Sequence, residues 1–132
     1  MYPPELLYTK EHEWIRVDGS LGTIGITDHA QKELGDIVFV ELPKPGEHIT
    51  AQETFGTVES VKAVSEIYAP VTGEVTSVNG RLQNAPELLN ADPHGDAWLV
   101  KVRLSDRSEV EGLMTSDEYE AYINAGLPGG KA

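Results

Sequence analysis

The fold is decided by residues 53–73, which read ETFGTVESVKAVSEIYAPVTG. Apolar and polar residues alternate on both sides of a short central stretch, which is typical of two half-buried β-strands joined as a hairpin. We expect these strands at 54–59 and 63–69, with residues 60–62 as the connection. Because so short a connection projects its central side chains into water, Lys62 is expected at the most protruding point of the domain.

The position of Lys62 leaves several interpretations open. Its small neighbours, Ser60 and Ala63, would leave the amine accessible to the active site of another protein. A Schiff-base lysine needs an apolar pocket that lowers its pKa, and a hairpin tip offers none, so a catalytic role is disfavoured. The remaining interpretation is an ordinary solvated lysine on a β-sandwich adaptor whose hairpin stays unmodified.

Short alternating runs continue outside the hairpin up to about residue 104. The further strands are expected at 13–17, 21–26, 36–42, 74–78 and 97–104. A short helix is expected at 29–34, with Thr27-Asp28 as its N-cap and Gly35 as its stop.

The chain from residue 79 onward follows a different pattern. Residues 79–96 are expected to be irregular, with a turn of helix at 86–89, and the apolar spacing in 105–126 suits helices. The N-cap of the last helix is expected at Ser116-Asp117 or at Thr115. We expect one domain over residues 1–126 and a flexible tail at 127–132.

The composition excludes several classes of function. The 132 residues hold 22 acidic and ten basic side chains, a formal net charge of −12, which repels nucleic-acid phosphates and anionic membranes. The chain has no cysteine, which excludes thiolate metal sites and disulfides. Four scattered histidines, among them His12 and His29, form no ligand set, so no metal site is expected. The sequence shows no signal-peptide pattern and no apolar run long enough to span a membrane, so we expect a soluble protein of the bacterial cytoplasm.

The hairpin carries a specific motif. Glu59-Ser60-Val61-Lys62-Ala63 resembles the acceptor sequence of lipoyl-carrying domains, with Gly73 eleven residues after the lysine and Gly56 six before it. Biotin-carrying relatives place methionine on both sides of the lysine. Val61 and Ala63 stand there in this sequence, so lipoate is favoured over biotin.

The resemblance extends to the H proteins of the glycine cleavage system over about residues 5–125. It rests on four blocks that stand in the order of that family: residues 8–14 (YTKEHEW), 23–30 (TIGITDHA), 34–43 (LGDIVFVELP) and 58–63 (VESVKA). One departure is His94, where the family leads us to expect tyrosine.

The resemblance implies the fold and the chemistry. The fold would be mainly β, a barrel-sandwich hybrid of two small antiparallel sheets with a lipoyl-type hairpin and short C-terminal helices. Lipoate in amide linkage to Lys62 would accept the aminomethyl group that a glycine decarboxylase (P protein) produces. An aminomethyltransferase (T protein) would pass it to tetrahydrofolate, and a dihydrolipoyl dehydrogenase (L protein) would reoxidise the dithiol. A lipoate ligase or lipoyl transferase would attach the group, and the carrier would be a non-catalytic monomer.

The resemblance also assigns site residues. Glu59, Ser60, Val61 and Ala63 would be read by the enzyme that attaches lipoate. Glu13 and Glu66 would line a cleft in which the loaded arm rests, since a carboxylate favours a protonated amine. The alternative is that Glu13 is only the outward residue of an alternating strand and Glu66 only a solvated charge on a strand face. A second hypothesis from the same chemistry is a relay protein that donates lipoyl groups to other lipoyl-dependent complexes.

Overall fold

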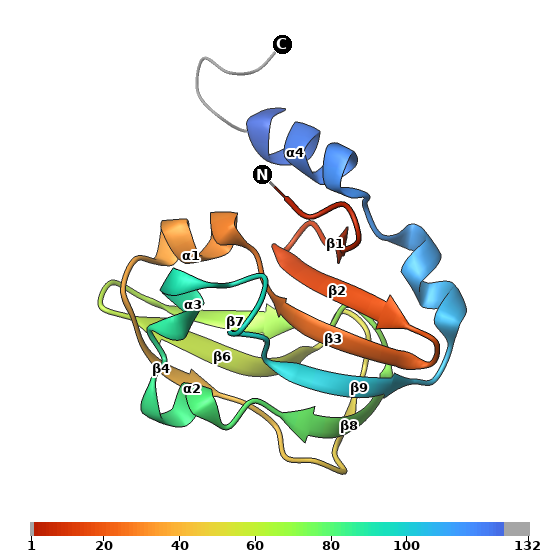
Figure 1. Ribbon diagram of the computed structural model, residues 1–132, viewed down its shortest axis with the longest axis horizontal. Helices are drawn as coiled ribbons and strands as arrows, with labels where there is room; N and C mark the ends of the chain where they lie inside the picture. Colours follow the sequence, from red (N-terminus) through yellow and green to blue (C-terminus); the bar gives the residue numbers. More distant parts are fainter. Residues whose placement is uncertain (1, 126–132) are drawn as a thin grey trace.

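The computed structural model describes residues 2–125, which form two antiparallel sheets packed on one core (Figure 1). The larger sheet has six strands in the order β1-β2-β3-β9-β8-β5, and the smaller has three in the order β4-β6-β7. The strands of the larger sheet are β1 (Leu7–Tyr8), β2 (Glu13–Asp18), β3 (Leu21–Ile26), β5 (His48–Ile49), β8 (Gly73–Val78) and β9 (Val100–Leu104). Those of the smaller sheet are β4 (Ile37–Glu41), β6 (Thr54–Ser60) and β7 (Val64–Tyr68).

The larger sheet grows from the β2–β3 hairpin. Gly19 turns the chain at φ +64, a left-handed conformation that glycine adopts without strain. A Cβ at Gly25 would lie 2.5 Å from the Trp14 ring, and Trp14 is fully buried. Trp14 is therefore an anchor of the core, and the missing side chain at Gly25 leaves room for its ring.

The smaller sheet carries the hairpin that the sequence predicted. Strand β6 pairs with β7 in the register Thr57↔Glu66 and Glu59↔Val64. On its other side β6 pairs with β4, and Phe39 lies opposite Glu59. This register brings the outward side chains of three strands into one row, with Glu59 at its centre.

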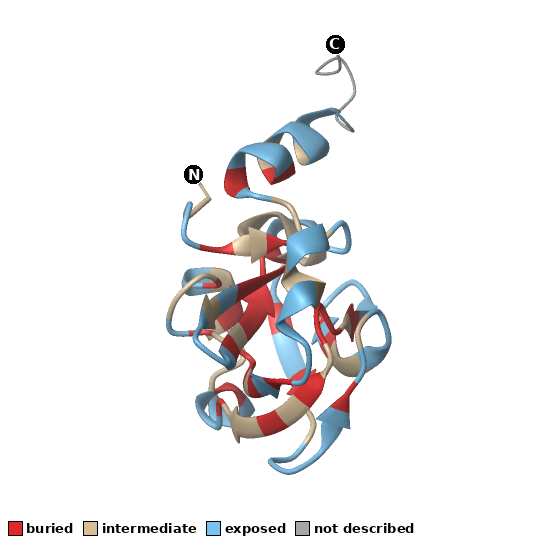
Figure 2. Cartoon of the chain, turned by 90° about the vertical axis from the view of Figure 1, so that its right-hand side faces the viewer, coloured by how far each residue is buried: buried red, intermediate tan, exposed pale blue. Residues whose placement is uncertain are grey.

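The core lies between the two sheets. Its main cluster draws buried aliphatic side chains from both, such as Ile24 and Val102 from the larger sheet and Val40 and Val58 from the smaller. Figure 2 shows the buried residues gathered in the interior and the exposed ones over the outer strands and the C-terminal helix. A second cluster joins Trp14 to the aromatic side chains that hold the N- and C-terminal segments together.

Short helices close the ends of the sandwich. They are α1 (Asp28–Leu34), α2 (Arg81–Asn84), α3 (Leu88–Ala91), the 3-10 helix η1 (Arg107–Gly112) and α4 (Ser116–Ala125). The Thr27 hydroxyl accepts a hydrogen bond from Ala30 N–H, and the predicted cap of α1 is confirmed. Thr115 and Glu118 exchange backbone-to-side-chain hydrogen bonds at the start of α4, which settles the second cap on Thr115.

The mainly β architecture with two antiparallel sheets and C-terminal helices is confirmed, with local corrections. The strand expected at 97–104 begins only at Val100, the turn of helix expected at 86–89 lies at Leu88–Ala91, and the two-residue strands β1 and β5 and helix α2 were not predicted. Such short elements depend on tertiary pairing rather than on a local period. The predicted tail at 127–132 lies outside the described residues. Within residues 2–125 no helix combines the length and apolar character needed to cross a membrane.

Candidate functional site

Lys62 lies in the three-residue turn between β6 and β7. Its side chain is exposed, as predicted, and the turn is shaped by Ser60. The Ser60 hydroxyl accepts hydrogen bonds from the N–H groups of Lys62 and Ala63, both at 3.1 Å. Lys62 and Ala63 are exposed, as access to the amine requires, whereas Ser60 is buried and makes its contacts within the turn. The Ser60 side chain thus sets the conformation in which the lysine is displayed.

The tip of the hairpin is tied to the segment that follows α1. The Val61 N–H donates to the Asp36 carbonyl at 3.0 Å, so pairing continues one residue past the end of β6. Gly35 then lies opposite Lys62, and a Cβ at Gly35 would come within 3.3 Å of the lysine Cε. Gly35 also has φ +81. The glycine predicted only as a helix stop therefore also leaves room for the lysine stem.

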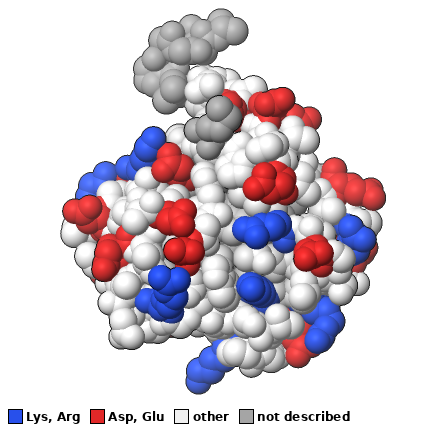
Figure 3. Space-filling model, in the orientation of Figure 1, with Lys and Arg blue, Asp and Glu red and all other residues white. Residues whose placement is uncertain are grey.

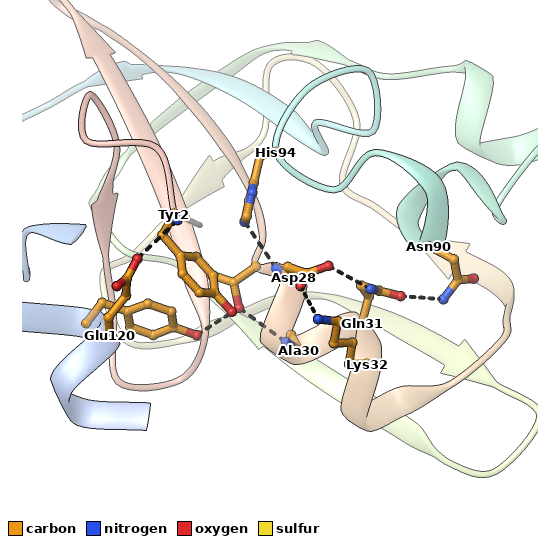
Figure 4. Close-up of polar contacts among 10 residues, drawn as sticks. Tyr2, Asp28, Ala30, Gln31, Lys32, Asn90, His94 and Glu120 are labelled. Atoms are coloured by element: carbon orange, nitrogen blue, oxygen red, sulfur yellow. Dashed lines mark hydrogen bonds and ion pairs between the residues drawn. The ribbon is translucent and has the colours of Figure 1, made fainter. Parts of the chain in front are cut away.

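Asn90 of α3 fixes this segment from the inside. Its amide nitrogen donates to the Gly35 carbonyl and to the Gln31 side chain, both at 2.9 Å, and its oxygen accepts from the Ile37 N–H at 2.9 Å. Figure 4 shows Asn90 and Gln31 in a chain of contacts that runs along α1 to Asp28. One asparagine thus holds both flanks of Asp36, the residue that anchors the hairpin tip.

A cleft of about 560 Å³ lies at the other end of β7. It lies between the segment that precedes β2, the end of β7 and the segment that links η1 to α4. Its lining combines polar groups with aromatic and aliphatic surface: Tyr8, Thr9, Lys10, Glu11, Glu13, Gln52, Tyr68, Ala69, Pro70, Gly112, Leu113 and Met114. Tyr8 and Met114 exchange two backbone hydrogen bonds of 2.8 Å, which close one wall of the cleft.

Glu13 is the buried acid of this cleft. Only 2% of its surface is exposed, so the interpretation of Glu13 as an outward strand charge is wrong. The Thr9 hydroxyl donates to one carboxylate oxygen at 2.6 Å, and the Tyr68 N–H donates to the other at 3.1 Å. Burial raises the pKa of Glu13 from 4.5 to about 7, although these two hydrogen bonds lower it. The carboxyl group therefore titrates near neutrality.

Glu66 is exposed and does not line the cleft. It accepts hydrogen bonds from the Thr54 hydroxyl at 3.1 Å and from the Tyr68 hydroxyl at 3.2 Å. Tyr68 is therefore the link between the two predicted acids, because its N–H binds Glu13 and its hydroxyl binds Glu66. Glu66 is connected to the cleft only through its hydrogen bond with the Tyr68 hydroxyl, because Tyr68 lines the cleft and Glu66 does not.

Three of the four histidines, His12, His29 and His94, lie at or beside α1. The rings of His12 and His29 lie 4.5 Å apart, and His12 Nδ1 lies 2.7 Å from the Tyr119 hydroxyl. His94 Nε2 accepts a hydrogen bond from the Asp28 N–H at the start of α1 (Figure 4), and burial lowers the pKa of His94, which suits a neutral acceptor. No group of three or more His, Cys, Asp or Glu side chains suited to a metal ion occurs within the described part of the chain.

The residues present fit a lipoyl group. Lys62 is exposed, and Gly35 leaves space along its stem. The cleft offers aliphatic and aromatic walls, including Leu113 and Met114, to a hydrocarbon arm and a carboxyl group to a cationic end. Lys62 would hold the group covalently, and Glu13 is the buried acid that lines the cleft.

Sequence reasoning missed Thr9, Tyr68 and Asn90. Thr9 and Tyr68 flank predicted acids, but their roles depend on backbone contacts across elements. Asn90 lies in the stretch expected to be irregular, and no local pattern connects it to the hairpin.

Comparisons with known proteins agree with this arrangement. The family model described as glycine cleavage H-protein matches residues 6–126. A glycine cleavage system H protein of Herpetosiphon aurantiacus is 58% identical over 122 residues, covering 92% of this chain and 93% of the relative. One of Geobacillus kaustophilus is 57% identical over 124 residues, covering 94% and 98%. The crystal structure of a glycine cleavage system H protein from Mycobacterium marinum superposes with a TM-score of 0.86 at 38% identity, covering 96% of this chain and all of that one.

Proposed function

The chain belongs to the glycine cleavage H-protein family, and from that premise we propose that it is a lipoyl carrier whose attachment point is Lys62. The observation that carries the proposal is the display of one lysine on a turn built for it. The Ser60 hydroxyl accepts a hydrogen bond from the Lys62 N–H, and the Asp36 carbonyl accepts one from the Val61 N–H. Gly35 leaves space beside the lysine side chain.

Lipoate bound to Lys62 would supply a cyclic disulfide that accepts an aminomethyl group from glycine, yields it for transfer to tetrahydrofolate and is then reoxidised. The partners that this role requires are a glycine decarboxylase, an aminomethyltransferase and a dihydrolipoyl dehydrogenase. A lipoate ligase or lipoyl transferase is needed for attachment. The chain itself contributes no catalytic residue in this proposal, and it works as a monomer in the bacterial cytoplasm.

The chain itself contributes in two ways: it displays Lys62, and it shelters the carried group. A lysine on a firmly held turn presents its amine in one place, which lowers the entropic cost of reaching an enzyme's active site. The cleft beside Glu13 shelters a cationic cargo from water. Because a nearby cation favours the charged form of an acid, arrival of an ammonium group would release the proton from Glu13.

Intact mass tests the attachment. The protein is incubated with ATP, lipoate and a lipoate–protein ligase, and we expect one lipoyl increment in the parent and none in Lys62→Arg, which keeps the charge. Lys32→Arg, at another exposed lysine, is the matched control and should gain the increment. An unmodified parent, or a modified Lys62→Arg, refutes the proposal.

Retention of the carried amine tests the roles of Glu13 and Glu66. In lipoylated protein loaded by glycine decarboxylase, Glu66→Ala should leave attachment intact and speed the spontaneous release of the amine, and Glu13→Gln should speed it more. Glu66 has the smaller effect because it reaches the cleft only through Tyr68. Equal release rates in the parent and both variants would contradict the proposal that Glu13 and Glu66 retain the carried amine.

A further inference from the structure

Two residues other than glycine have a left-handed backbone in the described part of the chain, and both border the cleft. They are His12 with φ +74 and Gln52 with φ +71. In this conformation the side chain crowds the backbone, and residues held in it are found most often at functional sites. Gln52 lines the cleft itself, and His12 directly follows residues 9–11, which also line it.

The contacts of His12 account for its conformation. Its Nδ1 atom lies 2.7 Å from the Tyr119 hydroxyl, and its ring centre lies 4.5 Å from that of His29. Histidine also adopts the left-handed region more readily than most residues. The contact with helix α4 therefore offsets the backbone strain at His12.

The contacts of Gln52 do not account for its conformation in the same way. Gln52 is the third residue of a turn that is closed by a hydrogen bond of 3.0 Å from the Glu53 N–H to the Thr50 carbonyl. A positive φ at this position is the type II pattern, in which glycine or asparagine is usual. The Gln52 side chain is exposed on the cleft wall, and no hydrogen bond joins it to another described residue. Glycine would make the same turn without strain, so the turn does not explain the glutamine side chain.

Gln52 and Glu13 lie on opposite sides of one short stretch of backbone. The Tyr68 N–H donates to the Glu13 carboxylate, and the carbonyl of the next residue, Ala69, accepts from the Gln52 N–H at 2.7 Å. Backbone groups of successive residues in an extended chain point to opposite sides. The backbones of Glu13 and Gln52 are therefore about 10 Å apart, or two strand spacings. Both side chains line the same cleft, so a small group held between them is within reach of both.

A carried ammonium group needs an acceptor besides Glu13. It has three N–H donors, whereas hydrogen bonds from Thr9 and Tyr68 leave the Glu13 carboxylate about two of its lone-pair sites. Charge alone does not select the cleft either, because the chain has 22 acidic residues and Figure 3 shows them spread over the visible face. A second acceptor that converges on the same point makes one place better than the others. The amide oxygen of Gln52 is such an acceptor.

We propose that Gln52 is a binding residue of the cleft, whose side-chain amide oxygen accepts a hydrogen bond from the aminomethyl ammonium group on the lipoyl arm, across from Glu13. This rests on the proposed function. The hydrogen bond retains the amine against hydrolysis. In that reaction water displaces the amine from carbon, the carbon–nitrogen bond breaks and ammonium leaves, and the hydroxymethyl group then departs from sulfur as formaldehyde, leaving the thiol.

Gln52→Met tests the acceptor, because methionine keeps the side-chain length and the strained backbone and removes the amide. Each protein is fully lipoylated, loaded with glycine by glycine decarboxylase and separated from the enzyme, and the release of ammonia is followed with time. We expect release to be about five-fold faster in Gln52→Met than in the parent. Gln83→Met, at an exposed glutamine of α2 outside the cleft, should release ammonia at the parental rate. Equal rates in Gln52→Met and the parent would overturn the proposal.

Gln52→Gly separates binding from a role in folding. Glycine relieves the strain at φ +71, so the urea midpoint of the unlipoylated variant should equal or exceed that of the parent. Release of ammonia from the loaded variant should nevertheless be about five-fold faster. Ala51→Gly, in the same turn but without a positive φ, should lower the midpoint and leave release unchanged. A lower midpoint in Gln52→Gly with release at the parental rate is the result of a purely structural glutamine and overturns the proposal.

The side-chain NH₂ resonances of Gln52 give a readout that does not depend on turnover. In nitrogen-15 spectra of the lipoylated protein, these resonances should shift when the arm is loaded, and those of Gln83 should not. Resonances of Gln52 that stay in place would overturn the proposal. If the parent gains no lipoyl mass, the proposed function fails. If the parent gains the mass and is loaded, and Gln52→Met releases ammonia at the parental rate, only this inference fails.

Discussion

The two sheets share one core but present different outer faces. Facing inward, both bury aliphatic side chains completely. Facing outward, the larger sheet shows basic side chains such as Arg16 and Arg103, while the smaller shows glutamates and apolar side chains and no basic residue in its strands. The inner faces account for the fold, and the outer faces differ in charge and in exposed apolar surface. Four substitutions test this division, beginning with the largest effect.

Gly73→Ala tests how tightly the larger sheet is closed. A Cβ at Gly73 would collide with the Arg103 backbone carbonyl of the neighbouring strand, which cannot move aside. We expect the free energy of unfolding to fall by about 4 kcal/mol. Gly80→Ala is the matched control, because nothing lies within 4 Å of a Cβ there. Urea unfolding followed by tryptophan fluorescence measures both, and equal stability of the two variants would contradict the account.

Glu13→Gln tests the seam between the sheets, where Glu13 of β2 binds the Tyr68 N–H of β7. The folded pKa of Glu13 is raised from 4.5 to about 7, so the folded state binds the proton more tightly. Stability is therefore lost as the pH rises from 4.5 to 7, on the order of 3 kcal/mol at full ionisation.

Glutamine cannot ionise, so the variant should lack this part of the pH dependence. Relative to the parent it should gain stability between pH 4.5 and 8. Chemical unfolding at several pH values measures the difference. Parallel pH profiles for the parent and Glu13→Gln would show that the carboxyl group ionises as freely in the folded state as in the unfolded chain.

Asn90→Ala tests the support of the hairpin tip. The change removes three hydrogen bonds of 2.9 Å around the Gly35–Ile37 segment, to which Val61 is tied. We expect amide hydrogen exchange at Ile37 and Val61 to speed up by roughly ten-fold or more, equivalent to about 1–2 kcal/mol of local stability. Asn84→Ala, at an exposed asparagine of α2, should leave both amides unchanged. Unchanged exchange in Asn90→Ala would mean that the tip is held by other contacts.

Arg103→Gln tests the outward charges of the larger sheet. Arg103 donates to Glu74 at 3.0 Å, but both side chains are largely exposed. We expect unfolding to change by less than about 0.5 kcal/mol and lipoyl attachment to stay at the parental rate. A large effect on attachment would show that the enzyme contacts the basic face of the larger sheet. That result would contradict the distinction between the two outer faces.

Local patterns predicted much of the fold. The alternation in residues 53–73 located the hairpin, the Thr27 and Gly35 signals bounded α1, and Lys62 was placed at an exposed turn. These features are local, so the sequence around each one determines it. Strands β1 and β5 were missed because two residues carry no measurable period.

The site was only partly predictable for a related reason. Lys62 is identified by its motif, whereas Glu13 accepts a hydrogen bond from the N–H of Tyr68, which lies 55 residues away. Asn90 reaches Gly35 across a similar separation. Ser60 was predicted only as a small neighbour of the lysine, and its hydrogen bonds within the turn were not predicted. Long-range polar contacts of this kind leave no period in the sequence.

Glycine-dependent reduction of NAD in the reconstituted system tests the central claim most directly. The assay combines the protein with glycine decarboxylase, aminomethyltransferase, dihydrolipoyl dehydrogenase and tetrahydrofolate. We expect NADH formation with lipoylated parent, and none with the unmodified parent or with Lys62→Arg taken through the same lipoylation step. NADH formation with Lys62→Arg, or its absence with parent of confirmed lipoyl mass, would contradict the account of this chain as a carrier that works through Lys62.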